Sequence, residues 1–96
     1  MMIEEFRSSL QEGQPPDGAN DLLAALWYDA KGDWDQAHRL AQDVDDANGA
    51  WVHAYLHRKE GDQGNAGYWY DRSGRPFCRN SLQEEWEHLV SELLVK

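Results

Sequence analysis

The stretch that decides the fold is residues 50–74, AWVHAYLHRKEGDQGNAGYWYDRSG. Helix-forming side chains fill residues 50–60, and Gly61 follows them where a glycine commonly ends a helix. A second helix is predicted over residues 63–73, and Gly74 ends it in the same way. The stretch therefore predicts two antiparallel helices joined by a short turn.

The same pattern occurs 29 residues earlier in the chain. A helix is predicted over residues 22–31, and a second one, with an apolar stripe, over residues 34–44. The matching positions are Gly32-Asp33 with Gly61-Asp62, Ala25 with Ala54, and Ala37 with Ala66. One helical hairpin cannot bury its apolar stripe alone, so we expect the two hairpins to stack.

Further helices are predicted on either side of the hairpins. The apolar spacing of residues 2–12 indicates a short helix, which the two prolines and two glycines of residues 13–20 end. Near the other end, Ser81 and Glu84 form a capping box, S-x-x-E, before a long amphipathic segment.

The sequence thus predicts a single all-α domain over residues 1–96. Residues 1–19 would form the N-terminal helix and a linker, and residues 20–76 the two stacked antiparallel hairpins. Residues 80–96 would form a capping helix that covers the open end of the stack.

The hairpins resemble the tetratricopeptide repeat, which has a small residue, an aromatic residue, a Gly-Asp turn, an alanine and a proline in a set order. In the second copy this order is followed by Ala54, His57, Gly61, Asp62, Ala66, Tyr70 and Pro76. The resemblance covers about residues 20–76, although the spacing of 29 is shorter than the 34 of that repeat. It implies that the first helix of each hairpin lines a concave groove. Residues 51–76 are also similar to a family of small uncharacterised bacterial proteins, which implies no reaction.

Composition excludes several classes of protein. The chain carries 18 acidic and 9 basic residues, a net charge of −9, which disfavours binding to nucleic acid and to anionic membranes. Five tryptophans and 41% hydrophobic residues are too many for a disordered chain, and one cysteine excludes an intramolecular disulfide. No signal-peptide pattern and no membrane-spanning apolar run is visible, so we expect a cytoplasmic protein.

The middle of the chain differs from the rest in charge. Residues 51–80 carry three acidic and five basic residues, the latter being Arg58, Lys59, Arg72, Arg75 and Arg79. Trp51, Tyr55 and Arg58 share one helical stripe at i, i+4 and i+7. We predict that this stripe faces the groove, where the arginine would bind a carboxylate or phosphate. The alternative is that both aromatic residues belong to the core and the arginine is a solvated helix end.

His53 and His57 have the i, i+4 spacing that two metal ligands on one helix require. No third ligand is close in sequence, and Glu60, Asp62, His38 and Cys78 would have to approach through the fold. We predict that the two imidazoles pack or form hydrogen bonds, with no metal and no cofactor.

The helix over residues 63–73 contains three consecutive aromatic residues and two glycines. Successive helical residues turn by about 100°, so the three rings cannot all be buried, and Tyr68 is expected at the surface. Gly64 and Gly67 each cost about 1 kcal/mol relative to alanine, which predicts a close approach of another backbone.

We predict a small interaction module that binds a protein or peptide segment, or a small anionic ligand, in preference to catalysis. Self-association into a homo-oligomer is the third possibility. The candidate binding residues are Trp51, His53, Tyr55, His57, Arg58, Tyr68 and Arg72. The alternative function is an enzyme or a small-molecule or metal binder that uses His53, Tyr55, His57 and Arg58.

Overall fold

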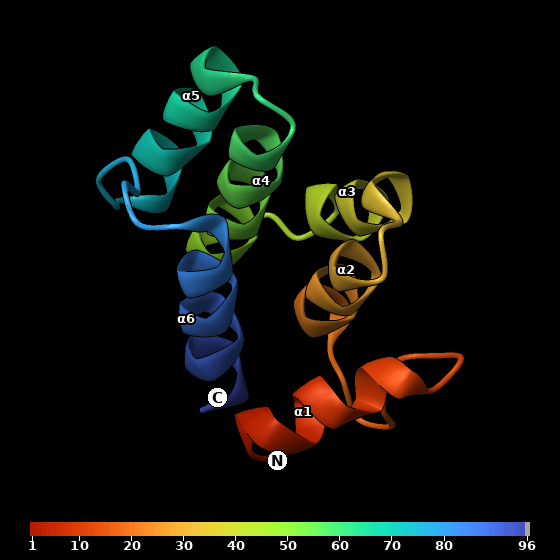
Figure 1. Cartoon of the computed structure of the whole chain (residues 1–96). Coiled ribbons are helices and arrows are strands. Elements are labelled where there is room, and N and C mark those ends of the chain that lie inside the picture. The colour runs from red at the N-terminus through yellow and green to blue at the C-terminus, as the bar shows by residue number, and fades with distance from the viewer. Residues whose placement is uncertain (96) are drawn as a thin grey trace.

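The computed structural model describes residues 1–95, and these form helices and no strand (Figure 1). The prediction of an all-α fold is therefore confirmed. The elements in chain order are α1 (Ile3–Ser8), the 3-10 helix η1 (Ser9–Gln11), α2 (Asp21–Ala30), α3 (Trp34–Gln42), α4 (Ala47–Lys59), α5 (Gln63–Ser73) and α6 (Leu82–Leu94). None of these helices combines the length and the apolar character that crossing a bilayer requires.

The repeated Gly-Asp pair joins the two helices of each hairpin. Gly32 and Gly61 have φ of +90° and +91°, a backbone conformation that glycine adopts without strain. The aspartate that follows then caps the next helix: the Asp33 carboxylate accepts from Gln36 N–H at 3.2 Å, and the Asp62 carboxylate accepts from Asn65 N–H at 3.2 Å. Two residues thus end one helix and begin the next, which explains their recurrence.

The helices pack as two stacked hairpins with a sixth helix across them. α2 packs on α3 and α4 on α5, while α4 also contacts both helices of the first hairpin (Figure 1). α6 packs along α2 and α4, and α1 lies against α6. The core side chains include Phe6, Leu26, Trp27, Val52, Leu56, Tyr70, Trp86, Leu89 and Val90. The face that α2 and α4 share is thereby covered by α6.

α4 begins three residues before the predicted start at residue 50, because Asp46 caps it. The Asp46 carboxylate accepts from Gly49 N–H at 2.8 Å. A Cβ atom on Gly49 would lie 1.9 Å from the Val44 carbonyl oxygen, so only glycine fits there. The close approach predicted for Gly64 and Gly67 is wrong, since a Cβ would meet only one atom, 4.0 Å away, at the former and none within 4 Å at the latter.

These two environments predict opposite effects of the same substitution. Gly67→Ala should stabilise the fold by about 1 kcal/mol, because alanine is the better helix former and its methyl group meets open space. Gly49→Ala should destabilise it by about 1–3 kcal/mol, because the methyl group displaces the Val44 backbone. Urea denaturation of both variants measures the difference, and equal changes in stability would contradict the described packing.

Candidate functional site

The stripe predicted to bind a ligand faces α6 and not solvent. Trp51 and Tyr55 are only 3% and 2% exposed, and the Arg58 side chain is largely covered. The prediction that these three residues face an open groove where they bind a ligand is wrong. The physical reason is that the groove between the first helices of the hairpins is occupied by the chain's own α6.

Arg58 does bind a carboxylate, but that carboxylate belongs to Glu85 of α6. The distance from Arg58 Nη1 to Glu85 Oε1 is 2.8 Å, and Arg58 also donates to the Asn80 carbonyl. Trp51 Nε1–H and the Tyr70 hydroxyl donate to Glu85 Oε2 at 3.2 and 2.6 Å. Burial first, and then the hydrogen bond to Glu85, raise the pKa of Tyr70 above its ordinary value. This buried network stabilises the packing of α6 and leaves none of its four members free for a ligand.

Tyr55 is used in a second buried network. Its hydroxyl donates to Asp29 Oδ2 at 3.0 Å, and Lys59 Nζ donates to Asp29 Oδ1 at 2.9 Å. Burial and then the negative charge of Asp29 raise the pKa of Tyr55, so the phenol stays protonated at neutral pH. The structure therefore does not bring Tyr55 or Arg58 to the histidines, as the predicted four-residue cluster requires.

Two predicted residues, Tyr68 and Arg72, lie on the outer face of α5. Tyr68 is 52% exposed, as predicted. Arg72 donates to the Tyr68 hydroxyl at 3.2 Å, and its guanidinium carbon lies 5.2 Å from the centroid of Trp69. Binding of a protein segment at this surface stays a prediction.

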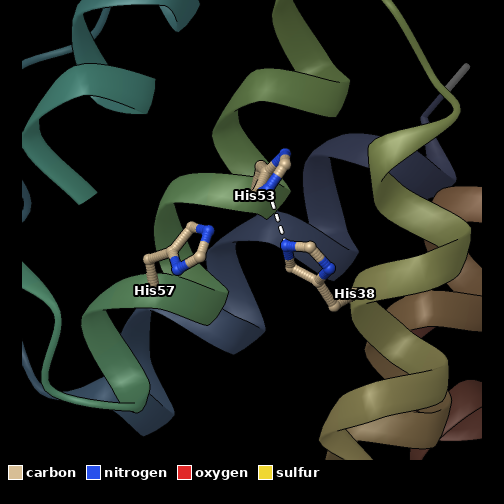
Figure 2. A group of neighbouring side chains, drawn as sticks. All are labelled: His38, His53 and His57. Carbon is tan, nitrogen blue, oxygen red and sulfur yellow. Dashed lines mark hydrogen bonds between the residues drawn. The ribbon is translucent and has the colours of Figure 1, made fainter. Parts of the chain in front are cut away.

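His53 and His57 meet a third histidine, His38, where α3 packs against α4 (Figure 2). The Nε2 atoms of His38 and His53 are 2.8 Å apart. One ring nitrogen from each of the three histidines lies within 4.8 Å of the other two. The contact between the hairpins thus brings a third candidate ligand to the pair of histidines on α4.

Tryptophan rings hold two of the imidazoles in place. The Trp69 ring of α5 stacks on His53 with centroids 3.9 Å apart and planes 12° apart. The Trp34 ring of α3 stacks on His38 at 4.9 Å, and Trp34 Nε1–H donates to the Leu56 carbonyl at 2.9 Å. The predicted packing and hydrogen bonding of His53 and His57 is therefore confirmed, and it orients the rings toward one another.

Hydrogen bonds constrain the tautomers of these rings. His57 Nδ1 lies 2.6 Å from Glu60 Oε1, and an ionised carboxylate only accepts, so Nδ1 carries the proton. A neutral His57 then has its lone pair on Nε2. Between His38 and His53, one Nε2 donates and the other accepts. The Nε2 atoms of His38 and His53 thus share one hydrogen bond, with one proton between them.

The environment keeps His38 and His53 uncharged at neutral pH. Burial, followed by the proximity of His38 and His57, lowers the pKa of His53 to about 4. Burial and then His57 also lower the pKa of His38 below its ordinary value. A neutral imidazole is the form that ligates a metal. The ring whose Nε2 donates in the His38–His53 hydrogen bond would have to carry its proton on Nδ1 instead before that Nε2 could ligate.

An acidic groove connects this cluster with the surface. His53, only 7% exposed, lines a pocket of about 540 Å³ together with Trp69 and Arg72. The other side is formed by the loop between α3 and α4, which contributes Asp43, Asp45 and Asp46. Three aspartates against one arginine, Arg72, which pairs with Asp45 at 3.7 Å, give this lining a net negative charge, and such a charge raises the local concentration of cations.

The remaining candidate ligands divide into two groups. Glu60 and Asp62 form a second cluster with His57, again with ligand atoms within 4.8 Å. Cys78 lies between α5 and α6, and in residues 1–95 it belongs to neither cluster. From the sequence, His38 is one of four residues that could approach through the fold. Nothing in the sequence favours it over the other three, because its position depends on how α3 packs against α4.

Comparisons with known proteins found no relative of this chain. No protein-family model matches it, and neither a search of curated proteins nor a search of solved structures gave a match. What the site can do is therefore argued from the chemistry of its own side chains.

Proposed function

We propose that this chain is a small metal-binding domain in which His38, His53 and His57 ligate one divalent transition-metal ion. The observation that carries the proposal is the convergence of three imidazole nitrogens, from two packed helices, within 4.8 Å of one another. Metal binding uses histidines that the fold brings together, whereas the aromatic and cationic stripe predicted for the interaction module is covered.

The distance between the Nε2 atoms of His38 and His53 is shorter than a tetrahedral site requires, and the other nitrogen pairs of the cluster lie within 4.8 Å. Zn–N bonds of about 2.0–2.1 Å at tetrahedral angles place two ligand nitrogens about 3.4 Å apart. The Nε2 atoms of His38 and His53 are 2.8 Å apart and would have to separate by roughly half an ångström.

The chemistry of the ligands selects the class of metal. Imidazole nitrogens suit Zn²⁺, Cu²⁺ and Ni²⁺, whereas Ca²⁺ and Mg²⁺ require oxygen ligands. Glu60 resembles the carboxylate that typically accepts from the far nitrogen of a metal-bound histidine and fixes its orientation. Three protein ligands leave a fourth position for water or for an incoming group.

The test is a calorimetric titration of EDTA-treated protein with Zn²⁺, supported by the absorption spectrum of the Co²⁺ form. We expect one equivalent to bind. His38→Gln, His53→Gln and His57→Gln should each weaken binding by at least about 100-fold, since even an orienting neighbour of a ligand is worth 10–100-fold. His88→Gln is the matched control, because the fourth histidine is exposed on α6 and pairs with Glu92.

The opposing outcome is that the histidines only pack. Zn²⁺ would then fail to bind stoichiometrically, or all four variants would lose affinity to the same small extent. Far-ultraviolet circular dichroism of each variant shows that lost binding does not come from lost helix. Either result would contradict the proposal.

A further inference from the structure

The segment between α5 and α6 borders a second pocket, distinct from the one that His53 lines. The pocket has a volume of about 340 Å³. Its lining includes Trp51, Arg75, Phe77, Cys78, Arg79 and His88. It lies in the locally basic part of an otherwise acidic chain.

Two arginines of this pocket differ from the other basic residues in residues 1–95. Six of the eight lysines and arginines there donate to a side chain or carbonyl of the protein; these are Arg7, Lys31, Arg39, Arg58, Lys59 and Arg72. Within the same range, the guanidinium groups of Arg75 and Arg79 have neither a hydrogen bond nor an ion pair with the protein. Both unpaired groups line the one pocket.

Aromatic rings hold both guanidinium groups while leaving their N–H edges unused. The guanidinium carbon of Arg75 lies 3.5 Å from the centroid of Trp51, and that of Arg79 lies 5.7 Å from Phe77. Stacking on a ring restricts the plane of a guanidinium but uses none of its five N–H groups. Such an arrangement costs little entropy when the donors later bind an oxyanion in a bidentate manner.

Glu85, the carboxylate in the lining of this pocket, is already paired with Arg58. Glu85 contributes to the lining, but it is buried and its oxygens accept from Arg58, Tyr70 and Trp51. Its ion pair with Arg58 at 2.8 Å offsets its charge toward an incoming anion. Arg75 and Arg79 therefore add an uncompensated positive charge to this pocket.

We infer that Arg75 and Arg79 bind a small oxyanion, a carboxylate or a phosphate monoester, that is attached to an apolar group. The two guanidinium groups would bind the oxygens, and the apolar group would lie against Phe77 and Pro76 on the same wall. This site is independent of the histidine cluster, and no part of the inference requires a bound metal.

The experiment uses phenyl phosphate and benzoate as ligands, followed by calorimetry and by chemical-shift changes of the arginine side chains in EDTA-containing buffer. We expect saturable binding with a dissociation constant of about 1 mM or tighter for one of the two. The preferred ligand tells a phosphate from a carboxylate. Benzamide, the uncharged counterpart of benzoate, should not bind.

Arg79→Gln should weaken binding at least about tenfold, because it removes charge-assisted hydrogen bonds from a residue that is exposed. Arg75→Gln should do the same, with thermal unfolding as a check that Trp51 stays packed. Arg39→Gln on α3 is the matched control, since it makes the same change in net charge beside Gln36 only. Equal loss in all three variants, unchanged affinity in Arg79→Gln, or no saturable binding to either anion would overturn the inference.

Discussion

Replacing Glu85 with alanine is expected to lower the free energy of unfolding by about 3–5 kcal/mol, the typical cost of removing one partner from a buried ion pair. The carboxylate is the common acceptor for Arg58, Tyr70 and Trp51. Without it, a largely covered guanidinium loses its counter-charge, and two buried donors lose their acceptor. Urea denaturation followed by circular dichroism measures the effect.

Glu87→Ala is the matched control on the same helix. Its carboxylate pairs with Arg7 at 3.1 Å, and both side chains are well exposed, so the change should cost less than about 1 kcal/mol. Glu85→Gln keeps the size of the side chain and one acceptor oxygen but removes the charge, and it should fall between the two. If Glu85→Ala is no more destabilising than Glu87→Ala, Glu85 does not hold α6 in the groove.

The helices themselves could be predicted because their signals are local. Gly32 and Gly61 end helices whatever the tertiary structure is, and the aspartate after each begins the next helix. The capping box of Ser81 and Glu84 is likewise complete within four residues, with hydrogen bonds of 3.1 and 3.2 Å. Such features need no information about which helix packs where.

These local patterns could not predict that α6 would cover the groove between the hairpins. The spacing of Trp51, Tyr55 and Arg58 shows that they share a face, but it does not show what lies against that face. What lies against that face is decided by tertiary packing. α6 buries four apolar side chains in the core, and Glu85 on the same helix is buried beside them; the four are Trp86, Leu89, Val90 and Leu93. An apolar stripe on α6 of this size had to be buried, and the shared face of α2 and α4 accommodates it.

The histidine cluster was also predictable in its local part and not in its tertiary part. The i, i+4 spacing of His53 and His57 on one face of α4 follows from helix geometry. The position of His38 depends on how far α3 is rotated against α4, and the hydrogen bond from Trp34 Nε1–H to the Leu56 carbonyl helps to fix that rotation. The resemblance to tetratricopeptide repeats stays a prediction. It rests on the order of residues within the hairpins, and no family model or solved structure matches the chain to test it.

Acidification is the second change with a large expected effect. With EDTA present, so that no metal contributes, the fold should lose about 3 kcal/mol through His53 alone between pH 6.5 and pH 4. Its pKa falls from 6.5 to about 4 on folding, and each pKa unit is worth about 1.4 kcal/mol. Denaturant titrations across this pH range provide the measurement.

The direction follows from proton linkage. Below pH 6.5 the unfolded chain binds a proton at His53, while the folded chain stays neutral there until about pH 4. Stability from this group is complete above pH 6.5 and is lost as the pH falls toward 4. Burial opposes the charged form most, and His38 from α3 and His57 on α4 oppose it as well. Of the groups that line the same pocket, α5 contributes Trp69 and the cationic Arg72, and the α3–α4 loop contributes Asp43, Asp45 and Asp46.

The His53→Gln variant separates this effect from the titration of the carboxylates, which both proteins share. Glutamine does not titrate, so the difference in stability between the two proteins should shrink by about 3 kcal/mol on going from pH 6.5 to pH 4. A constant difference between the wild type and His53→Gln would mean that His53 titrates alike in the folded and unfolded chain, and that its ring is not held neutral between Trp69 and His38.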